Sequence, residues 1–207
     1  MSQPYVLYGR PGSGSVAVQV ALEEIGAPYE RVWVGRESAD VERFRHINPT
    51  GRVPALRLPD GTVMFESAAI LIHLSLAHPQ ARLAPPPGST DHARFLQWMV
   101  YLSANVYEAA LRTYYSARYT SRGEADAEVV RQQGEADFLQ FLGLPAQALS
   151  PYLLGETVCI ADAYLSMLVS WYPDMAQLEA RYPSLREHTR RMKARASVTK
   201  VDADHAT

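Results

Sequence analysis

A glycine- and serine-rich loop near the start of the chain could bind an anion. The loop, Gly12-Ser13-Gly14-Ser15, comes directly before a stretch with helical spacing. Such a loop turns backbone N–H groups and the positive end of a helix dipole toward an approaching anion. The hydroxyls of Ser13 and Ser15 could also donate to a thiolate, or could cap the helix. The loop lacks the lysine of a phosphate-binding P-loop and the G-x-G-x-x-G spacing of dinucleotide-binding proteins.

Two further motifs combine charged side chains with available backbone groups. Arg52-Val53-Pro54 follows an Asn-Pro-Thr-Gly turn, and a proline that opens a strand lacks a donor and is the residue type that adopts cis peptide bonds. Glu66-Ser67, at the start of a predicted helix, places a carboxylate beside a hydroxyl and the first backbone N–H groups of the helix. Those groups could meet the ammonium and carboxylate of an amino acid. Each motif alone is typical of a strand start or a helix cap, and their joint order favours a binding site.

The composition limits the classes of protein that fit. The 207 residues are 47% hydrophobic and 20% charged, which favours a folded chain with one large or two small domains. A net charge of −2 provides no basic field, so nucleic-acid binding is not expected. No apolar run approaches the roughly 20 residues that cross a bilayer, and the N-terminus has no signal-peptide pattern, so we expect a cytoplasmic protein. One cysteine, Cys159, and six histidines without ligand spacing predict no metal site.

Strands and helices alternate in the first part of the chain. In order, the pattern predicts a strand at 5–8, a helix from Ser15 to Gly26, a strand at 29–34, a short helix at 39–46, strands at 53–58 and 62–65, and a helix capped by Ser67. The last two strands flank Pro59-Asp60-Gly61, a tight hairpin signal. The order β-α-β-α-β-β-α is typical of a layered α/β unit.

A proline run separates this part from a helical part. Pro85-Pro86-Pro87-Gly88 cannot lie inside a helix or a central strand. We therefore predict an α/β domain at 1–78, a linker at 79–89 and an all-helical domain at 90–207. The helical patterns of the second domain cover 90–119, 124–142, a buried stretch from 160 that ends before 173, and 183–195.

These motifs together resemble the cytosolic glutathione transferase superfamily. The similar runs are Asn48-Pro49-Thr50-Gly51-Arg52-Val53-Pro54-Ala55-Leu56, Asp60-Gly61-Thr62 and Glu66-Ser67-Ala68-Ala69-Ile70. Gly155 followed by Ile160-Ala161-Asp162-Ala163-Tyr164 is similar to the core helix motif of the family's helical domain. The resemblance covers nearly all of the chain. It implies a thioredoxin-like N-terminal domain packed on an all-helical bundle, generally as a homodimer.

The resemblance also implies how glutathione, as the co-substrate, would bind. The backbone of Val53, beside a cis Pro54, would pair with the cysteinyl part of glutathione. Glu66 and Ser67 would hold the γ-glutamyl end, and Arg52 would reach the glycyl carboxylate. A charge-assisted contact at each end and strand-like pairing in the middle suit a short anionic tripeptide. The thiol would then lie near the first helix.

The thiol must be activated, because an ordinary thiol has a pKa of about 8.5 and is mostly protonated at neutral pH. The family uses a Tyr, Ser or Cys at this step. Gly14 stands where bacterial beta-class members have a cysteine, so mixed-disulfide chemistry through an enzyme cysteine is not expected. Ser15, at the helix start, is the first candidate and Ser13 the second. Tyr8 is the third, since tyrosines in strands more often pack.

The electrophile would be met by the first long helix of the second domain. Helical spacing places Tyr101, Asn105 and Glu108 on one face, with Arg112 one turn further. This face could line the substrate site. The alternative is that these side chains pack the bundle core, which is common for tyrosines at such spacing.

The sequence thus predicts a glutathione transferase in which a hydroxyl and a helix N-terminus stabilise the thiolate for attack on a small hydrophobic electrophile. One alternative is a glutathione-dependent disulfide reductase or peroxidase without an enzyme cysteine. A second is a non-catalytic protein that binds glutathione or another ligand. A third is a domain that binds no glutathione and keeps the motifs as inherited features of the fold.

Overall fold

The computed structural model describes residues 3–206, which fold as two compact units. The first unit contains the residues up to Pro86 together with the segment from Lys193 onward, and the second runs from Pro87 to Met192. The division between Pro86 and Pro87 lies inside the predicted linker at 79–89. The start of that linker, Pro79–Ala81, forms a short 3-10 helix, η1.

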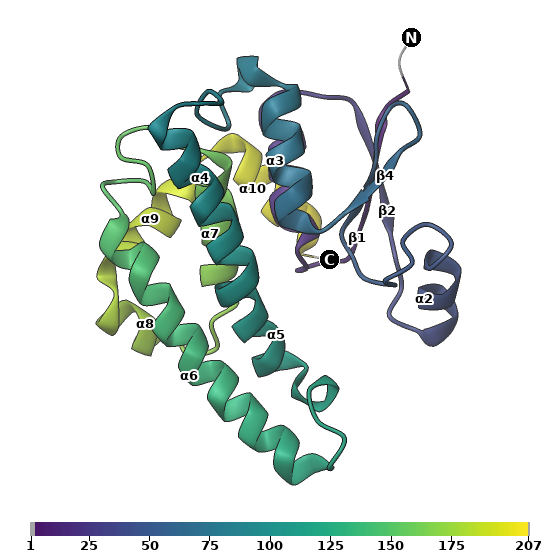
Figure 1. Cartoon of the computed structure of the whole chain (residues 1–207), viewed down its shortest axis with the longest axis vertical. Helices are drawn as coiled ribbons and strands as arrows, with labels where there is room; N and C mark the ends of the chain where they lie inside the picture. Colours follow the sequence, from purple (N-terminus) through teal and green to yellow (C-terminus); the bar gives the residue numbers. More distant parts are fainter. Residues whose placement is uncertain (1–2, 207) are drawn as a thin grey trace. The chain divides into compact units, whose positions relative to one another are not determined.

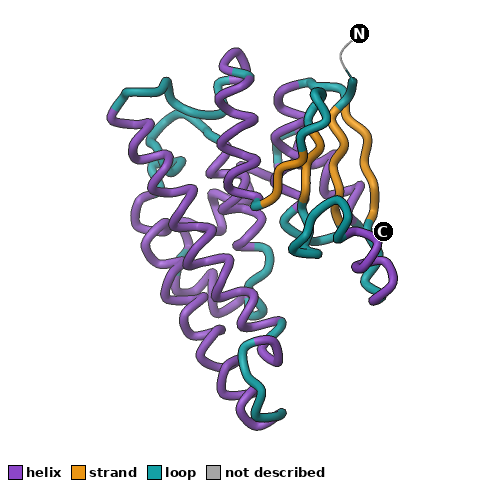
Figure 2. Tube along the Cα trace, turned by 45° about the vertical axis from the view of Figure 1, so that its right-hand side comes forward, coloured by secondary structure: helices purple, strands orange, loops and turns teal. Residues whose placement is uncertain are grey.

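A four-stranded sheet with the strand order β2-β1-β3-β4 forms the centre of the first unit (Figure 2, orange). β1 runs parallel to β2 and antiparallel to β3, and β3 runs antiparallel to β4. The elements of this unit, in chain order, are β1 (Tyr5–Gly9), α1 (Ser15–Ile25), β2 (Tyr29–Trp33), α2 (Ser38–Phe44), β3 (Ala55–Arg57), β4 (Val63–Phe65) and α3 (Ser67–Ala77). The predicted order β-α-β-α-β-β-α is confirmed.

Different helices cover the two faces of the sheet. Successive residues of a strand point to opposite faces, so Val6 and Tyr8 of β1 lie on one face and Leu7 on the other. Phe44 of α2 packs with Val6 and Tyr8, and the ring centroids of Tyr8 and Phe44 are 5.7 Å apart. α3 lies on the opposite side of the sheet from α2 (Figure 1) and contacts α1. Leu7 is fully buried on that side.

The helix boundaries in this unit follow the prediction to within two positions: α2, predicted at 39–46, spans Ser38–Phe44. α1 begins at Ser15, and Gly26, with a φ of 70°, closes it. The prediction that Ser67 caps α3 is wrong by one position, because Ser67 is already the first helical residue. Glu66 occupies the cap position with a φ of 68°, and its side chain makes no capping hydrogen bond. The reason is local: β4 ends at Phe65, so the chain turns into the helix through a single residue.

A helix that the sequence did not predict completes the first unit. α10 (Ala196–His205) packs against α1. Val198 and Val201 are its buried residues, and Lys200 forms an ion pair with Glu23 of α1 at 2.7 Å. Two apolar residues give only a weak helical pattern, which explains why the pattern was missed.

The packing of α10 changes the domain division. The sequence assigned 90–207 to the all-helical domain, whereas the segment from Lys193 groups with the α/β unit. The ion pair of Arg195 with Glu24, at 2.9 Å, contributes to this attachment. The segment is therefore held by ion pairs between residues far apart in the sequence and by its two buried valines.

The second unit is helical. Its elements are α4 (Thr90–Tyr101), the π-helical turn η2 (Leu102–Tyr107), α5 (Glu108–Tyr114), the 3-10 helix η3 (Ser116–Arg118), α6 (Glu124–Ala148), α7 (Ile160–Val169), α8 (Met175–Arg181) and α9 (Pro183–Lys193). Ser89 caps α4, since its hydroxyl accepts the N–H of His92 at 3.1 Å. α7 is buried at every position, also as predicted. The helix predicted to reach Tyr119 ends at Tyr114, and α8 was not predicted. Within residues 3–206 there is no helix that is long and apolar enough to span a membrane.

α5 and α6 approach each other closely at Gly134. A Cβ atom at Gly134 would lie 2.8 Å from the Cβ of Arg112 and 2.8 Å from the backbone nitrogen of Thr113. The side chain of Arg112 continues across the same contact to Asp137 of α6, with a nitrogen–oxygen distance of 2.8 Å. Because the obstructing atoms belong to the backbone and the first side-chain carbon, they cannot move aside without moving the helix.

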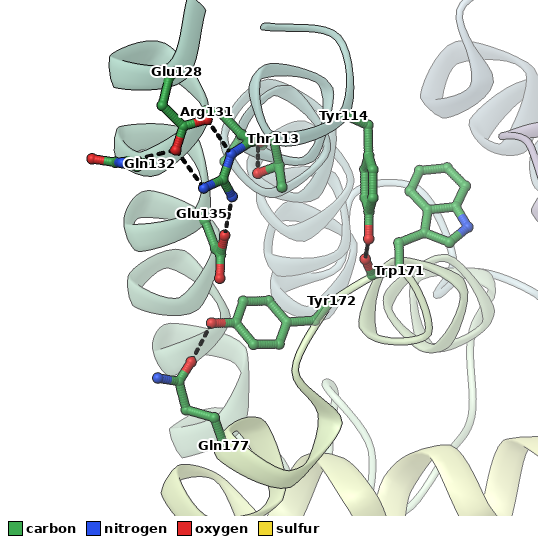
Figure 3. A network of polar contacts seen from close by, with 10 residues as sticks. Thr113, Tyr114, Glu128, Arg131, Gln132, Glu135, Trp171, Tyr172 and Gln177 are labelled. Carbon is green, nitrogen blue, oxygen red and sulfur yellow. Dashed lines mark hydrogen bonds and ion pairs between the residues drawn. The ribbon is translucent and has the colours of Figure 1, made fainter.

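Polar contacts along α6 extend this packing (Figure 3). Arg131 pairs with Glu128 at 2.7 Å and with Glu135 at 2.9 Å. The hydrogen bond from Arg131 lowers the pKa of Glu128 to about 2. The hydroxyl of Tyr114, at the end of α5, donates to the backbone carbonyl of Trp171. The last contact ties α5 to the segment that follows α7, whereas the ion pairs lie on the solvent side of α6.

We predict that Gly134→Ala destabilises the protein although alanine favours helices. Alanine contributes about 1 kcal/mol of helix propensity, but forcing a methyl group into a filled space costs about 1–3 kcal/mol. Urea unfolding followed by circular dichroism measures the difference. Gly143→Ala is the matched control on the same helix, because the atom nearest its Cβ, at 2.6 Å, is the hydroxyl at the end of the Tyr182 side chain. Equal stability of the two variants would contradict the prediction.

Candidate functional site

Three segments of the first unit meet at one end of its sheet. Tyr8 in β1 pairs with Ala55 in β3, and Ala55 pairs in turn with Phe65 in β4. The turn before β3 ends directly before Ala55, α3 begins two residues beyond Phe65, and the loop after β1 begins two residues beyond Tyr8, after Gly9. The motifs at 12–15, 52–54 and 66–67, which are far apart in the sequence, are therefore brought to the same end of the sheet.

Ser15 is buried at the start of α1. Its side chain has no exposed surface, and its Oγ lies 3.2 Å from the carbonyl oxygen of Arg10, to which it donates. A Cβ atom at Gly9 would lie 2.4 Å from the Oγ of Ser15, so the hydroxyl occupies space that only a glycine at the end of β1 leaves. The hydroxyl of Ser15 therefore points into the protein and away from solvent.

Ser13 is the more accessible of the two serines. Its Oγ donates to the carbonyl of Arg10 at 2.8 Å and lies 2.9 Å from the Oγ of Ser15. The residue is half-buried. Gly12, which precedes it, has a φ of 64° and space around its Cα. The loop can therefore present the hydroxyl of Ser13 to a bound molecule, while the hydroxyl of Ser15 stays inside.

Tyr8, the third candidate, lies in the core. Its side chain is 9% exposed and packs against Phe44 of α2. This is the packed position that is common for a tyrosine in a strand. The structure thus separates the three hydroxyl candidates by their access to solvent, with Ser13 ahead of Tyr8 and Ser15.

The turn before β3 is held by a buried asparagine. The Nδ2 of Asn48 donates to the carbonyl of Arg52 at 2.6 Å, and its Oδ1 accepts the N–H of Thr50 at 3.1 Å. Asn48 is 1% exposed. The Val53-Pro54 peptide bond that follows is cis, and Val53 lies just outside the β3 ladder. Asn48 thus fixes the backbone of the turn, in which the side chain of Arg52 is exposed and the side chain of Val53 packs against the core of the first unit.

Glu66 has an unusual backbone conformation. Its φ of 68° and ψ of 108° are rare for a residue with a side chain, and such conformations cost about 1–3 kcal/mol. The side chain of Glu66 is exposed, whereas Ser67 beside it is buried. The backbone therefore directs a carboxylate outward at the N-terminal end of α3, where the first N–H groups of the helix also face.

The four residues proposed to meet the electrophile lie in the second unit, on α4, η2 and α5. The hydroxyl of Tyr101 donates to the carbonyl of Phe141 in α6 at 2.8 Å. Arg112 pairs with Glu108 at 2.9 Å as well as with Asp137. These three side chains therefore contribute to the packing of the helices. Among the described residues, Asn105 has one long contact, in which its Nδ2 lies 3.4 Å from the carbonyl oxygen of Tyr101. It lies in a π-helical turn, a feature frequent at functional sites.

Known proteins resemble the chain in sequence. The family model of the glutathione S-transferase N-terminal domain matches residues 15–76. The uncharacterized GST-like protein YncG of Escherichia coli K12 is 32% identical over 173 residues, which are 81% of this chain and 82% of YncG. The chain belongs to the glutathione S-transferase family. Glutathione S-transferase GstA of Escherichia coli O157:H7 is 29% identical over 170 residues, 80% of this chain and 81% of GstA.

Solved transferases share the fold of this family member. A glutathione transferase homologue from Sulfitobacter, crystallised with bound glutathione, has a TM-score of 0.89 at 31% identity, with 100% of both chains covered. A sphingomonad glutathione S-transferase complexed with glutathione has a TM-score of 0.80 at 27% identity, covering 97% of this chain and 98% of that one. The predicted thioredoxin-like domain followed by a helical part, and membership of the cytosolic superfamily, are confirmed.

The site has features that sequence reasoning missed. Asn48 was treated as part of a turn, although an asparagine two residues before a threonine is a known signal for a side chain that bonds its own backbone. The burial of Ser15 had no local signal, because it depends on Gly9 in the preceding strand. In the part of the chain that the structure covers, no three His, Cys, Asp or Glu side chains gather closely enough to hold a metal ion.

We predict that Glu66→Gly makes this transferase-family protein more stable than Glu66→Ala. Both variants lose the carboxylate, but only glycine adopts a positive φ without steric cost. After subtraction of the conformational entropy of glycine, the expected gain is about 1 kcal/mol in the free energy of unfolding. Paired urea titrations measure it. Equal stability of the two variants would show that the backbone at Glu66 is unstrained.

Proposed function

We propose that the chain is a glutathione transferase whose glutathione site lies at the end of the sheet where β1, β3 and β4 meet. The observation that carries the proposal is the strand register, in which Tyr8, Ala55 and Phe65 are paired side by side. This register gathers an anion-binding loop, a strand edge and an exposed carboxylate. The glutathione found in the Sulfitobacter homologue, at 31% identity, supports the same ligand class here.

The proposed contacts follow the chemistry of the tripeptide. The backbone of Val53 pairs with the cysteinyl part of glutathione, beside cis Pro54. The carboxylate of Glu66 meets the ammonium of the γ-glutamyl end, while Ser67 and the N–H groups of α3 meet its carboxylate. Arg52 is exposed and pairs with the glycyl carboxylate. Opposite charges at both ends of the ligand fix its direction along the strand edge.

Ser13 is the proposed activating hydroxyl, ahead of Ser15. Ser13 is half-buried, whereas Ser15 is fully buried, and the hydroxyl of Ser13 lies beside the N-terminus of α1, where the helix dipole favours a negative sulfur. A donated hydrogen bond and the dipole both lower the pKa of the glutathione thiol. The thiol loses its proton to solvent, and the thiolate then forms a carbon–sulfur bond with the electrophilic carbon while the bond from that carbon to its leaving group breaks and the leaving group departs with the electron pair. Ser15 serves as a buried partner that orients the loop.

One residue of the second unit is proposed to bind the electrophile. Asn105 is retained as a substrate-binding candidate because its amide has only one long contact, whereas Tyr101, Glu108 and Arg112 are assigned to holding the helices together. The electrophile is expected to be small and hydrophobic. The homodimer and the cytoplasmic location, both predicted from the sequence, remain predictions.

A glutathione-binding protein without catalysis is the second candidate function. The observation in its favour is that both serine hydroxyls are engaged with the carbonyl of Arg10. A glutathione-dependent reductase or peroxidase remains an alternative, in which glutathione itself supplies the thiol. Turnover with a disulfide or hydroperoxide, and none with an alkylating electrophile, would favour it.

We predict that Ser13→Ala lowers kcat with an alkylating electrophile by roughly 10- to 100-fold, because it removes a donor to the reacting sulfur. The Kd for glutathione should stay within about twofold, because the donor contributes mainly to the thiolate state. Calorimetric titration with glutathione and thiolate ultraviolet absorbance provide the measurements. Ser15→Ala is the matched control and should keep most of the thiolate signal. The reverse pattern would assign the role to Ser15, and the absence of saturable binding in the wild type would reject the proposed function.

We predict that Glu66→Gln raises the Kd for glutathione about tenfold, because it removes the charge that meets the ligand's ammonium and a charge-assisted bond is worth about 1.5–3 kcal/mol. Glu30→Gln is the control, since Glu30 is an exposed carboxylate on β2, at the other edge of the sheet from β4. Calorimetric titration of the wild type, Glu66→Gln and Glu30→Gln with glutathione measures the three Kd values. An unchanged Kd in Glu66→Gln would remove Glu66 from the site.

A further inference from the structure

The C-terminal helix reaches back to the loop that carries Ser13. The backbone N–H of Gly12 donates to the Nδ1 of His205 at 3.2 Å, across 193 positions of sequence. The other ring nitrogen of His205 lies 2.9 Å from the Oε1 of Gln19 in α1. Gln19 has no exposed surface. The imidazole therefore bridges a surface loop and a buried side chain of the helix that follows it.

The hydrogen bonds around this imidazole fit a single arrangement of protons. Because Nδ1 accepts from Gly12, the proton of a neutral ring is on Nε2, which donates to the Oε1 of Gln19. The amide nitrogen of Gln19 then donates to Asp204 at 2.7 Å and to the hydroxyl of Tyr29 at 3.0 Å. That hydroxyl donates in turn to Glu23 at 2.6 Å. Every donor in the chain of contacts faces an acceptor.

Neighbouring groups favour the neutral form of the ring. Burial and, to a smaller extent, the positive charge of Arg31 lower the pKa of His205 to about 4, against the attraction of Asp204. Arg31 itself pairs with Asp204 at 2.7 Å. The ring of Trp33, also on β2, meets the imidazole edge to face with centroids 5.0 Å apart. At neutral pH the ring thus keeps the lone pair that accepts from Gly12.

We infer that His205 is a positioning residue, which holds the loop 10–14 through Gly12 and so sets the direction of the Ser13 hydroxyl. Gly12 depends on this hydrogen bond because little else packs against it: a Cβ atom built at Gly12 would meet no atom within 4 Å, and its φ of 64° is a conformation that favours glycine. The loop is also held by a local bond from the Ser13 hydroxyl to the carbonyl of Arg10 at 2.8 Å and by a bond from Arg10 Nε to the carbonyl of Val34 at 2.9 Å, neither of which involves Gly12. The effect on catalysis rests on the function proposed above, whereas the effect on the loop does not.

Two variants separate the two sides of the imidazole. In His205→Asn the amide oxygen takes the place of Nδ1 and keeps the acceptor for Gly12. In His205→Gln the amide nitrogen takes the place of Nε2, so the contact with Gln19 is kept and the acceptor is lost. Lys200→Ala is the control on the same helix, because it removes the ion pair with Glu23 but no contact with the loop.

Hydrogen exchange of the full-length protein, read by mass spectrometry on peptides that cover residues 9–16, tests the positioning role. Loss of one backbone hydrogen bond should speed exchange in His205→Gln about five- to tenfold. His205→Asn and Lys200→Ala should exchange at close to the wild-type rate. Wild-type exchange in His205→Gln would overturn the inference. Equal acceleration in Lys200→Ala would also overturn it, because it would show that only the docking of α10 matters.

Kinetics provide an independent readout of the same role. If the wild type turns over glutathione, kcat in His205→Gln should fall about fivefold with KM for glutathione nearly unchanged, and His205→Asn should restore kcat, in line with the energy of one hydrogen bond. Equal loss in both variants would contradict the assignment to the Gly12 contact. If the wild type shows no turnover with glutathione, the proposed function fails, and the exchange rates still decide whether His205 holds the loop.

The pH dependence of stability supplies a further check. The unfolded chain protonates His205 near the ordinary value of about 6.5, and the folded chain only near 4. Between these values the unfolded state binds more protons, so stability falls as the pH decreases from about 6.5 to 4. The stability difference between wild type and His205→Asn should shrink over this range, because asparagine does not titrate. A constant difference would mean that the imidazole is not held neutral by its contacts.

Discussion

The pairing of β3 with strands on both sides is the constraint on which the site depends. β3 has three residues, yet Ala55 pairs with Tyr8 on one side and with Phe65 on the other. Leu56, the middle residue of β3, is fully buried. A slip of one residue would turn Leu56 to the other face, and it would also separate the turn at Val53 from the start of α3. Burial of one leucine and the position of the groups proposed to bind glutathione are therefore set by the same register.

Two residues at the site have a backbone conformation or an environment that is unfavourable by itself. Glu66 holds a positive φ so that its carboxylate faces outward at the start of α3. The buried side chain of Asn48 loses its hydrogen bonds with water and forms hydrogen bonds with the backbone of the turn before Val53, at Thr50 and Arg52. In each case the surrounding sheet and helices supply the stability that fixes an unfavourable or desolvated group. The rigid layers of the first unit thus allow exact placement of a few polar groups at one edge.

Sequence reasoning succeeded where the determinants are local and failed where they are not. Alternating apolar residues, the hairpin signal at Asp60-Gly61 and the glycine at Gly26 were sufficient for the order of the elements. α10 was missed because its attachment depends on ion pairs with α1, such as Lys200 with Glu23, between residues that are far apart in sequence. For the same reason, the burial of Ser15 was not predicted. Space for its hydroxyl depends on the missing Cβ of Gly9 in another element.

The buried position of Ser15 gives it a role in the proposed activation. A hydroxyl has one proton, so Ser13 must turn its proton away from the carbonyl of Arg10 before it can donate to a sulfur. That carbonyl also accepts from the hydroxyl of Ser15 and from the backbone N–H of Ser13, each at 3.2 Å, and it therefore keeps two partners when the Ser13 hydroxyl turns. The cost of redirecting Ser13 is then one hydrogen bond to an acceptor that remains satisfied. Because both hydroxyls bond the carbonyl of Arg10, Ser13 can turn toward a ligand while Ser15 keeps its bond to that carbonyl.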